Sequence, residues 1–375
     1  MIKIQGVSKS YQQGTEVLSG IDLEVQEKEL VVLLGESGSG KTTLLKMINR
    51  LVDCSGGDIS INGQSIAEVD PVTLRRKMGY VVQQTGLFPH LTIKENIELV
   101  CKIQGMDKDT MQQRVETVME MVGLDADAFL YRYPKQLSGG QAQRVGVARA
   151  YATEPDIILM DEPFSALDPI TRKELQNELL RLQQTYPKTI LFVTHDIDEA
   201  IKLADRIVLL NNGHIEQIGT PRELLLHPNT QYVSKFLGEK KLWKAPWLIR
   251  CRDIMSTVVS CISRSEKLST AMEIIKNDKV KAIFATDENG AVCGKLTEKI
   301  LMRSANAETV EQAMKTAFDY AAPDTPVSQA VKLMNEKNVL YLPILDETMH
   351  LAGMLNMTDL MEIFSENVLS ETAVN

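Results

Sequence analysis

The chain has 375 residues, of which 44% are apolar and 24% are charged, and its formal net charge is −9. This length suits two or three domains, and the acidic balance argues against nucleic acid as a main partner, because binding phosphate backbones needs a basic surface. No apolar stretch reaches the roughly 18 residues that cross a bilayer, and residues 1–6 lack the apolar core of a signal peptide. We therefore expect a cytoplasmic chain whose five cysteines are free thiols.

The N-terminal part of the chain predicts strands that alternate with helices. Residues 17–25 alternate apolar and polar side chains, as a half-buried strand does. Continuous apolar runs predict buried strands at residues 30–34, 156–160 and 189–193, and helical spacing predicts helices at 41–51, within 92–135 and at 141–151. Such alternation predicts an α/β fold with a parallel sheet that is covered on both faces.

A glycine-rich motif follows the first apolar run: Gly35-Glu36-Ser37-Gly38-Ser39-Gly40-Lys41-Thr42. It matches the P-loop pattern, and it stands between a strand and a helix, as that motif requires. The glycines let backbone N–H groups turn inward around phosphates, Lys41 brings a positive charge to the β and γ phosphates, and the helix N-terminus adds positive potential. We expect this motif and the adjacent Thr43 to bind ATP, with the hydroxyl of Thr42 on Mg²⁺.

Two adjacent acids, Asp161 and Glu162, end the second apolar run. Paired acids at a strand end are more often a solvated turn, but a P-loop upstream favours a catalytic interpretation. Asp161 is then expected to hold Mg²⁺ through water, and Glu162 to polarise the water that attacks the γ-phosphate.

A second glycine-rich sequence, Leu137-Ser138-Gly139-Gly140-Gln141, precedes the helix predicted at 141–151. It is another helix N-terminus with exposed amides and a hydroxyl, in a chain with one P-loop. Either it is an ordinary helix cap, or it completes the nucleotide site of another copy of the chain. Taken alone, the sequence favours the cap.

Together these motifs resemble the nucleotide-binding domain of ABC transporters over residues 1–237. The matching residues, in order, are the P-loop, Gln83, residues 137–141, Asp161-Glu162, Ser165-Ala166-Leu167-Asp168 and His195. The resemblance implies a P-loop NTPase domain with a helical subdomain, and a homodimer in which two such domains meet head to tail. Residues 138–141 of one copy then close over the ATP that the P-loop of the other copy holds.

The same resemblance implies roles for residues outside the glycine-rich motifs. Gln83 would sense the metal and the attacking water on the side that faces a membrane subunit, His195 would contact the γ-phosphate, and Asp168 would make a contact across the dimer. Tyr11 falls where the family stacks an aromatic ring on adenine, although a lone tyrosine near the start of a chain is more often a packing residue.

Residues 46–51, 83–90 and 196–206 are similar to the quaternary-amine branch of this family. That branch imports glycine betaine, carnitine, choline or proline betaine, which implies a permease in the membrane, an extracytoplasmic substrate-binding protein, and a chain attached peripherally to the cytoplasmic face. An importer of another small polar solute and a soluble ABC ATPase without a transport role are the alternatives. A regulatory sensor with a silent ATPase is a third, but intact Lys41, Asp161, Glu162 and His195 argue against it.

The remainder of the chain contains an internal repeat. A shift of 59 positions aligns Leu268 with Val327 and Gly294 with Gly353, and each copy predicts a helix, a strand, a turn, a second strand and a helix. We therefore expect an ATP-binding domain at 1–237, a linker at 238–252, a first repeat at 253–308, and a second repeat with the tail at 309–375. The repeats predict a smaller α+β module.

The two copies resemble a tandem pair of CBS domains, with departures at the residues that bind ligands in that family. Thr297, Asn356 and Asp359 are the candidates for a regulatory ligand, while Ile300 replaces an Asp of the family pattern in the first copy. The resemblance implies an adenine nucleotide, with cyclic di-AMP the ligand suggested by importers of this layout. Electrostatic sensing at the membrane and a spacer that dimerises remain open, although an acidic module is repelled by anionic lipid.

Overall fold

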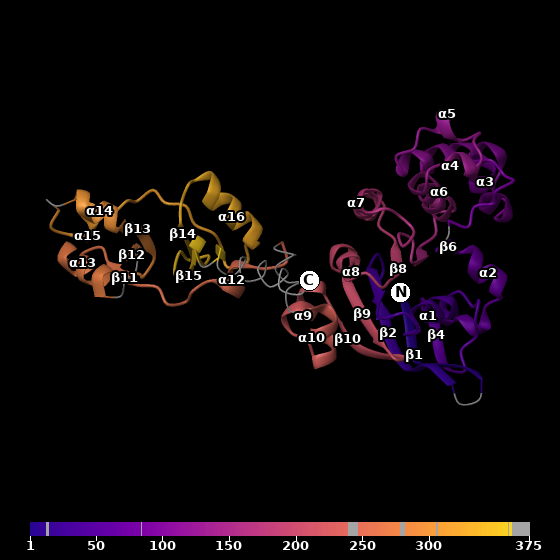
Figure 1. The fold of residues 1–375 in the computed structure, drawn as a ribbon, viewed down its shortest axis with the longest axis horizontal. Helices are drawn as coiled ribbons and strands as arrows, with labels where there is room; N and C mark the ends of the chain where they lie inside the picture. The colour runs from indigo at the N-terminus through magenta and orange to yellow at the C-terminus, as the bar shows by residue number, and fades with distance from the viewer. Residues whose placement is uncertain are drawn as a thin grey trace, which may run out of the picture. The chain divides into compact units, whose positions relative to one another are not determined.

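The computed structural model describes residues 1–12, 15–83, 85–238, 247–277, 282–304, 307–358 and 360–361. The chain divides into two compact units, Met1–Leu237 and Gly238–Asn375, and each is described by itself (Figure 1). Among the described residues, no helix combines the length and apolar character needed to cross a membrane. The domain limits expected from the sequence stay predictions.

A six-stranded sheet forms the centre of the first unit. Its spatial order is β10 (His214–Gly219), β9 (Arg206–Asn211), β3 (Leu30–Leu34), β8 (Thr189–Thr194), β7 (Ile157–Asp161) and β6 (Met78–Val81). All neighbours pair in parallel except β10 and β9. The predicted parallel sheet is therefore confirmed, with one antiparallel edge strand.

Strand β3 shows why its sequence is an unbroken apolar run. Leu30, Val32 and Leu34 pack into one hydrophobic core, and Val31 and Leu33 pack into another. Successive side chains of a strand point to opposite faces, so both faces of the sheet are covered and all five residues are buried.

A second sheet packs on the core that contains Val31 and Leu33. It is antiparallel, in the order β2 (Thr15–Val25), β1 (Ile2–Gln12), β4 (Gly56–Ile61) and β5 (Gln64–Ser65). The alternating pattern at residues 17–25 belongs to β2, as expected.

The other core, around Leu30, holds a group of helices that Figure 1 shows gathered beyond β6. This group consists of α3 (Ile93–Ile103), α4 (Lys108–Met121), α5 (Ala126–Phe129), η2 (Pro134–Gln136) and α6 (Gly139–Tyr151). The remaining helices of the unit are α1 (Lys41–Ile48), η1 (Ile66–Glu68), α2 (Pro71–Arg76), α7 (Pro169–Thr185), α8 (Ile197–Leu203), α9 (Pro221–Leu226) and α10 (Gln231–Leu237).

Helix α1 is shorter than the predicted 41–51, because Arg50 leaves the helical conformation with a φ of +52°. The Arg50 guanidinium donates to the carbonyl oxygens of Ile66 (2.9 Å) and Val69 (2.6 Å). These tertiary hydrogen bonds stabilise a turn that the local sequence pattern does not reveal.

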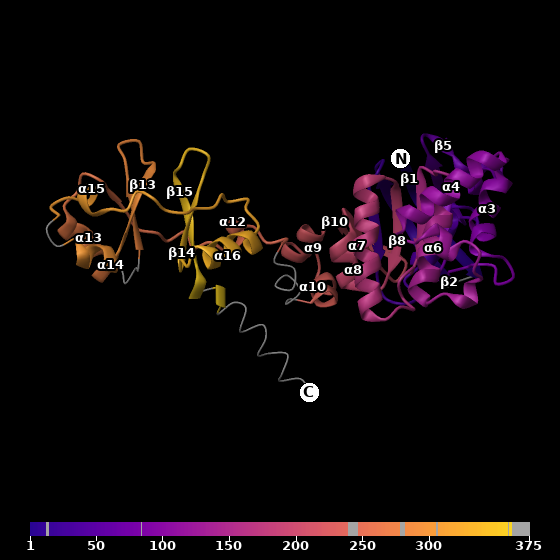
Figure 2. The same cartoon turned by 90° about the horizontal axis from the view of Figure 1, so that it is seen from above.

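The second unit contains the expected repeat. Its first half has α12 (Cys251–Ile254), β11 (Cys261–Ser263), α13 (Leu268–Asn277), β12 (Ala282–Thr286), β13 (Val292–Thr297) and α14 (Glu298–Arg303). Its second half has α15 (Val310–Ala313), α16 (Val327–Glu336), β14 (Tyr341–Leu345) and β15 (Leu351–Asn356). Helix α13 begins at Leu268 and α16 at Val327, which are 59 residues apart. Figure 2 shows the hairpins β12–β13 and β14–β15 next to each other, with their turns pointing the same way.

The two halves of this unit exchange their first helices. Ile249 and Cys251, which lie in the predicted linker, are fully buried in the core of the second half with Val327. Val310 and Ala313 belong to the core of the first half. The chain therefore enters the unit through its second repeat, and neither half has a complete core from its own residues.

Candidate functional site

The P-loop connects β3 to α1 in a conformation that glycine favours. Gly38 and Gly40 have φ values of +86° and +99°, in the left-handed region that other residues avoid. A Cβ added to Gly40 would lie 2.5 Å from Cδ2 of Leu18, so the side chain of the neighbouring strand leaves room for backbone alone. The loop therefore presents N–H groups at the start of α1, where an anion is favoured.

Lys41 is buried at the start of α1, with 5% of its surface exposed. Its ammonium donates to the carbonyl oxygens of Gly35 (2.8 Å) and Glu36 (2.7 Å). Burial lowers the pKa of Lys41, while the carboxylates of Glu162 and Asp161 act in the opposite direction. The ammonium also donates to the Ser39 hydroxyl at 3.4 Å. A desolvated cation that is held by neutral oxygens gains from a phosphate oxygen, because a hydrogen bond between two charged groups is stronger than one to a neutral acceptor.

Thr42 and Asp161 bring the P-loop helix and the end of β7 together. The Thr42 hydroxyl donates to Oδ1 of Asp161 at 2.8 Å. Burial raises the pKa of Asp161, although the bond from Thr42 favours its charged form. A hydroxyl and a buried carboxylate are the hard oxygen donors that Mg²⁺ takes alongside phosphate and water. The described residues contain no cluster of three or more His, Cys, Asp or Glu side chains that could hold a metal without the nucleotide.

The Glu162 carboxylate, at the end of β7, contacts one side chain from the end of each neighbouring strand. Nε2 of Gln83, beyond β6, donates to Oε2 of Glu162 at 3.3 Å, and Nδ1 of His195, beyond β8, lies 3.3 Å from Oε1. Glu162 itself has a φ of +44°, and its N–H donates to the carbonyl of Val193 (3.1 Å). Because β6, β7 and β8 are adjacent and parallel, their carboxyl ends bring these three residues to one edge of the sheet.

A buried network of hydrogen bonds includes Thr194, the residue that precedes His195. Glu199 on α8 is 4% exposed, and it accepts hydrogen bonds from the Thr194 hydroxyl (2.7 Å) and from Nε2 of Gln176 (3.2 Å). Burial raises the pKa of Glu199. Arg172 on α7 lies 3.9 Å from Glu199 and donates to the carbonyl of Leu167 at 3.0 Å. The network therefore links the segment before Asp168 to the residue that precedes His195.

The sequence at residues 138–141 forms a helix cap in this chain. The Ser138 hydroxyl accepts from the Gln141 N–H (3.2 Å), and Oε1 of Gln141 accepts from the Ser138 N–H (3.0 Å), which is a capping box. Ser138 and Gly139 are exposed, whereas Gly140 is buried, and a Cβ there would lie 2.3 Å from Cγ2 of Thr171. Among the hydrogen bonds of the described residues, none joins this cap to the P-loop.

Asp168 caps a helix, and Tyr11 lies on the protein surface. The Asp168 carboxylate accepts from the N–H groups of Ile170 and Thr171 (both 3.1 Å) and so caps α7. Hydrogen bonds from Thr171 lower the pKa of Asp168. Tyr11 is 57% exposed on β1, and Nζ of Lys9 lies 5.2 Å from its ring centroid. The ring is therefore a surface group and not a core residue.

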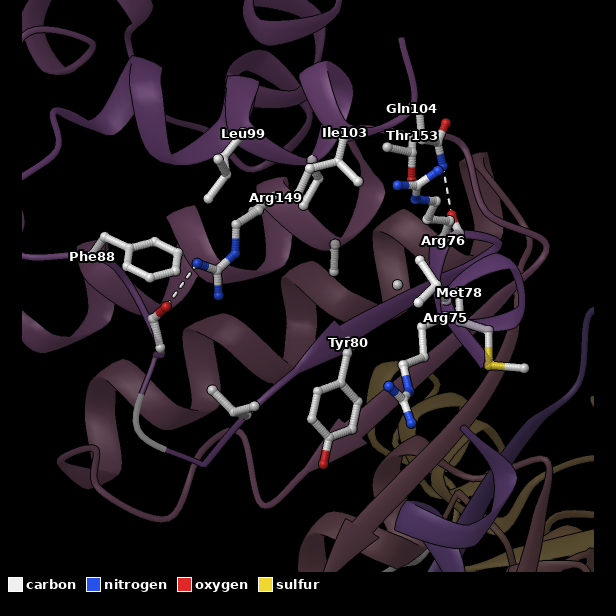
Figure 3. Close-up of a pocket in the computed structure, with 16 residues that line it drawn as sticks. Arg75, Arg76, Met78, Tyr80, Phe88, Leu99, Ile103, Gln104, Arg149 and Thr153 are labelled. Atoms are coloured by element: carbon white, nitrogen blue, oxygen red, sulfur yellow. Dashed lines mark hydrogen bonds between the residues drawn. The ribbon is translucent and has the colours of Figure 1, made fainter. Parts of the chain in front are cut away.

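A pocket of about 740 Å³ opens between β6 and α3 (Figure 3). Most of its lining is apolar, and its charged lining residues are Arg75, Arg76 and Arg149. Figure 3 shows Arg149 reaching from α6 toward the backbone beside Phe88. Its guanidinium donates to the carbonyl oxygens of Gly86 (2.7 Å) and Thr85 (3.2 Å), close to Gln83.

Sequence reasoning did not single out Arg149 or Glu199. The signal for Arg149 is a cation three and four residues after the buried Gly146 and Val145, on an otherwise apolar helix face. Glu199 lies in a segment whose resemblance to a family was recognised, but only the fold reveals that its carboxylate is buried.

In the second unit the candidate ligand residues have local structural partners. The Thr297 hydroxyl accepts from the Ile300 N–H (3.4 Å) and caps α14. Oδ1 of Asn356 accepts from the Thr358 N–H (3.0 Å). Asp359, the third candidate, lies outside the described residues.

The arrangement around Glu162 is chemically suited to phosphoryl transfer to water. It combines a cationic clamp at Lys41, oxygen donors for a metal at Thr42 and Asp161, and a carboxylate that two neighbouring side chains orient. These groups are the ones that position and stabilise the charge of a transferring phosphoryl group.

Comparisons with known proteins agree with this geometry. Residues 18–165 match the ABC transporter family, and residues 251–306 and 310–366 match the CBS domain family. The chain is 41% identical to the glycine betaine/carnitine/choline transport ATP-binding protein OpuCA of Bacillus subtilis, over 98% of this chain and 97% of that protein. It is 40% identical to the choline transport ATP-binding protein OpuBA of the same organism, over 99% and 98% of the two chains.

A solved structure shares the fold of the first unit. It is the dimeric structure of MJ0796, a bacterial ABC transporter cassette, with a TM-score of 0.54 and 36% identity, covering 59% of this chain and 99% of that chain. The chain therefore belongs to the ABC transporter family, as an ATP-binding and ATP-hydrolysing subunit of the quaternary-amine importer group that has a C-terminal pair of CBS domains.

Proposed function

We propose that two copies of this chain bind two molecules of Mg-ATP head to tail, and that hydrolysis drives uptake of glycine betaine, carnitine or choline through an integral-membrane permease. The convergence of Gln83 and His195 on Glu162, beside the P-loop, is the single observation that carries the ATPase part. Full-length similarity to transport proteins for these three solutes supports the substrate class.

Charge and geometry, together with the family resemblance, support the active-site roles that we propose. The P-loop amides and Lys41 bind the phosphates, and Thr42 and Asp161, with Gln83, would hold Mg²⁺, which neutralises phosphate charge when bound. Glu162 accepts a proton from the attacking water as general base. Gln83 and His195 keep the Glu162 carboxylate oriented, and His195 also contacts the γ-phosphate.

A second copy supplies the groups that the first copy does not bring to its own P-loop. Ser138 and Gly139 are exposed at the N-terminus of α6, where the amides favour an anion. The partner's residues 138–141 close over the ATP, Asp168 contacts the partner, and Tyr11 stacks on adenine. The similarity to a cassette whose structure is dimeric supports this assembly.

The pocket in Figure 3 receives a segment of the permease. Its lining includes Tyr80, Phe88 and Ile103, which favour an apolar helix face, and three arginines without an Asp or Glu. Phe88 and Ile103 are 43% and 48% exposed, so apolar surface is available for burial. Charge complementarity therefore favours a permease segment that combines apolar residues with a carboxylate.

In this assembly the chain is peripheral to the membrane, on its cytoplasmic face. The transported solute is bound by an extracytoplasmic binding protein and by the permease, because the contacts that select the solute belong to those subunits. The ATPase chain contributes the energy of ATP hydrolysis and not the selectivity.

The CBS pair regulates transport by binding an adenine nucleotide, with cyclic di-AMP as the first ligand to test. Thr297, Asn356 and Asp359 are the residues proposed to contact it. Thr297 and Asn356 already cap local backbone groups, so a ligand at these positions would compete with or extend those caps. Calorimetry of the full chain with adenine nucleotides tests this part.

Uptake of labelled glycine betaine, carnitine and choline in a strain that lacks the chain tests the transport function. The wild-type chain should restore uptake, and a Lys41→Ala variant should not. Co-purification with a membrane subunit separates a transport ATPase from a soluble ABC ATPase. Restored uptake of a different small polar solute would replace the substrate class, and a phenotype that needs no permease would remove the transport role.

A further inference from the structure

Arg149 forms hydrogen bonds to the loop that follows Gln83. It lies near the end of α6, between the buried residues Ala148 and Ala150. Its guanidinium reaches two successive carbonyl oxygens, those of Thr85 and Gly86, at 3.2 and 2.7 Å. Burial lowers the pKa of Arg149, and no carboxylate among the described residues pairs with it in a salt bridge. Its charge is therefore compensated by this loop.

The loop is shaped to meet α6 closely. Thr85 and Gly86 have φ values of +37° and +59°, which turns the backbone into a left-handed conformation. A Cβ added to Gly86 would lie 3.3 Å from Nη2 of Arg149, and one added to Gly146 of α6 would lie 3.4 Å from the Thr85 carbonyl oxygen. The small residues bring helix and loop together, and the guanidinium bonds stabilise a turn that a threonine would otherwise disfavour.

The loop of Thr85 and Gly86 and the helix α6 each adjoin a residue of the proposed ATP site. Gln83, two residues before Thr85, donates to Glu162. At its other end, α6 begins at Gly139, directly after the cap residue Ser138. Arg149 also lines the pocket of Figure 3. The Arg149 side chain therefore lines the pocket and bonds to the loop that follows Gln83. Arg149 also belongs to α6, the helix that Ser138 caps.

We propose that Arg149 is a positioning residue for ATP hydrolysis: it fixes the turn of Thr85 and Gly86 on α6, so that Gln83 meets Glu162 when α6 is correctly placed. A further consequence, which rests on the proposed permease contact, is that a segment entering the pocket acts on Gln83 through this guanidinium.

The test measures ATP hydrolysis by the purified full chain without a permease. Arg149→Met keeps the apolar length of the side chain and removes both donors, whereas Arg149→Lys keeps the charge but cannot donate to two carbonyls in a fixed fork. We expect kcat per ATP-binding site to fall about tenfold or more in the Met variant and less in the Lys variant, with KM for ATP within about twofold of wild type. Amides of residues 85–88 should exchange hydrogen faster than in the wild type.

A double variant separates positioning from general loss of structure. If Arg149 acts through Gln83, adding Arg149→Met to Gln83→Ala should reduce kcat no further, because residues that act as a unit are not additive. The matched control is Arg144→Met, since Arg144 lies on the same helix and bonds to Val122 and Glu178 instead of the loop. This control should lower thermal stability but leave kcat per site and loop exchange unchanged.

An unchanged kcat per site in both Arg149 variants would overturn the proposal, and so would independent, multiplicative losses in the double variant. If Arg149→Met does not fold, the same comparisons with Arg149→Lys decide the question. Because none of these measurements uses a permease, the positioning role can fail while the transport function stands. Loss of permease-stimulated activity in Arg149→Lys, measured afterwards in the assembled complex, tests the link to the pocket.

Discussion

Replacing Glu162 with glutamine should separate ATP binding from ATP hydrolysis. Glu162→Gln keeps the size of the side chain and leaves Lys41 and Thr42 untouched, so ATP should still bind. The amide cannot accept a proton from water as a carboxylate does. It must also place one NH₂ group against either Nε2 of Gln83 or Nδ1 of His195, both 3.3 Å from the present oxygens.

The magnitude follows from the loss of a general base that two side chains orient. Removing such a group costs about 10²- to 10⁴-fold in rate, which corresponds to about 3–5 kcal/mol of transition-state stabilisation. The affinity for ATP should stay within about threefold of wild type, because the phosphate contacts of the P-loop are unchanged. Closed, ATP-bound dimers should therefore accumulate.

Single-turnover hydrolysis and gel filtration with Mg-ATP measure the two effects. Glu178→Gln is the matched control, because the side chains of Glu178 and Glu162 are 14% and 19% exposed and Glu178 pairs with Arg144 and Arg181, away from the site. The control should hydrolyse ATP normally and should not trap a dimer. Normal turnover by Glu162→Gln would refute the role of Glu162 as base.

Four further changes test individual contacts. Lys41→Ala removes a charge-assisted contact worth about 1.5–3 kcal/mol, so ATP binding measured by calorimetry should weaken about 10- to 100-fold. Ser138→Asp keeps an equally good helix cap but places a negative charge against the partner's ATP, so the melting temperature should stay near wild type while ATP-dependent dimerisation is lost; retained dimerisation would contradict the cross-dimer site. In Gly140→Ala the new methyl group meets Cγ2 of Thr171, which should destabilise the chain by about 1–3 kcal/mol, and adding Thr171→Ser should restore most of the melting temperature. Burial raises the pKa of Glu199, so the folded chain binds the proton of this carboxyl group more tightly than the unfolded chain. The stability of the fold therefore falls as pH rises through the raised pKa. Glu199→Gln should make the free energy of unfolding, measured in urea at several pH values, depend less on pH, and an unchanged pH dependence would contradict this assignment.

Most secondary-structure elements of the first unit follow from local patterns. The apolar run of β3 and the glycines before Lys41 predict a strand, a loop and a helix without reference to the rest of the chain, and the structure has them in that order. The predicted end of α1 was wrong, because the left-handed Arg50 is stabilised by carbonyls of residues 66 and 69, which are distant in sequence.

The candidate site was only partly accessible from the sequence. Motifs identified Gln83, Glu162 and His195 one by one, but their contacts join three strands and depend on the strand order of the sheet. Arg149 belongs to no motif that was recognised, since its partners are backbone carbonyls and any residue type can supply a carbonyl. A hydrogen bond to a backbone carbonyl therefore cannot be inferred from the type of residue that supplies the carbonyl.

By itself, the sequence determined the repeat, the P-loop and the amphipathic elements, because each depends on residue spacing within a short segment. Only the tertiary structure decided that Gln83 meets Glu162 across a separation of 79 residues, and that Ile249 completes the core of the second repeat instead of the first. Both results depend on which surfaces bury each other, and burial of this kind is a property of the whole fold and not of a local pattern.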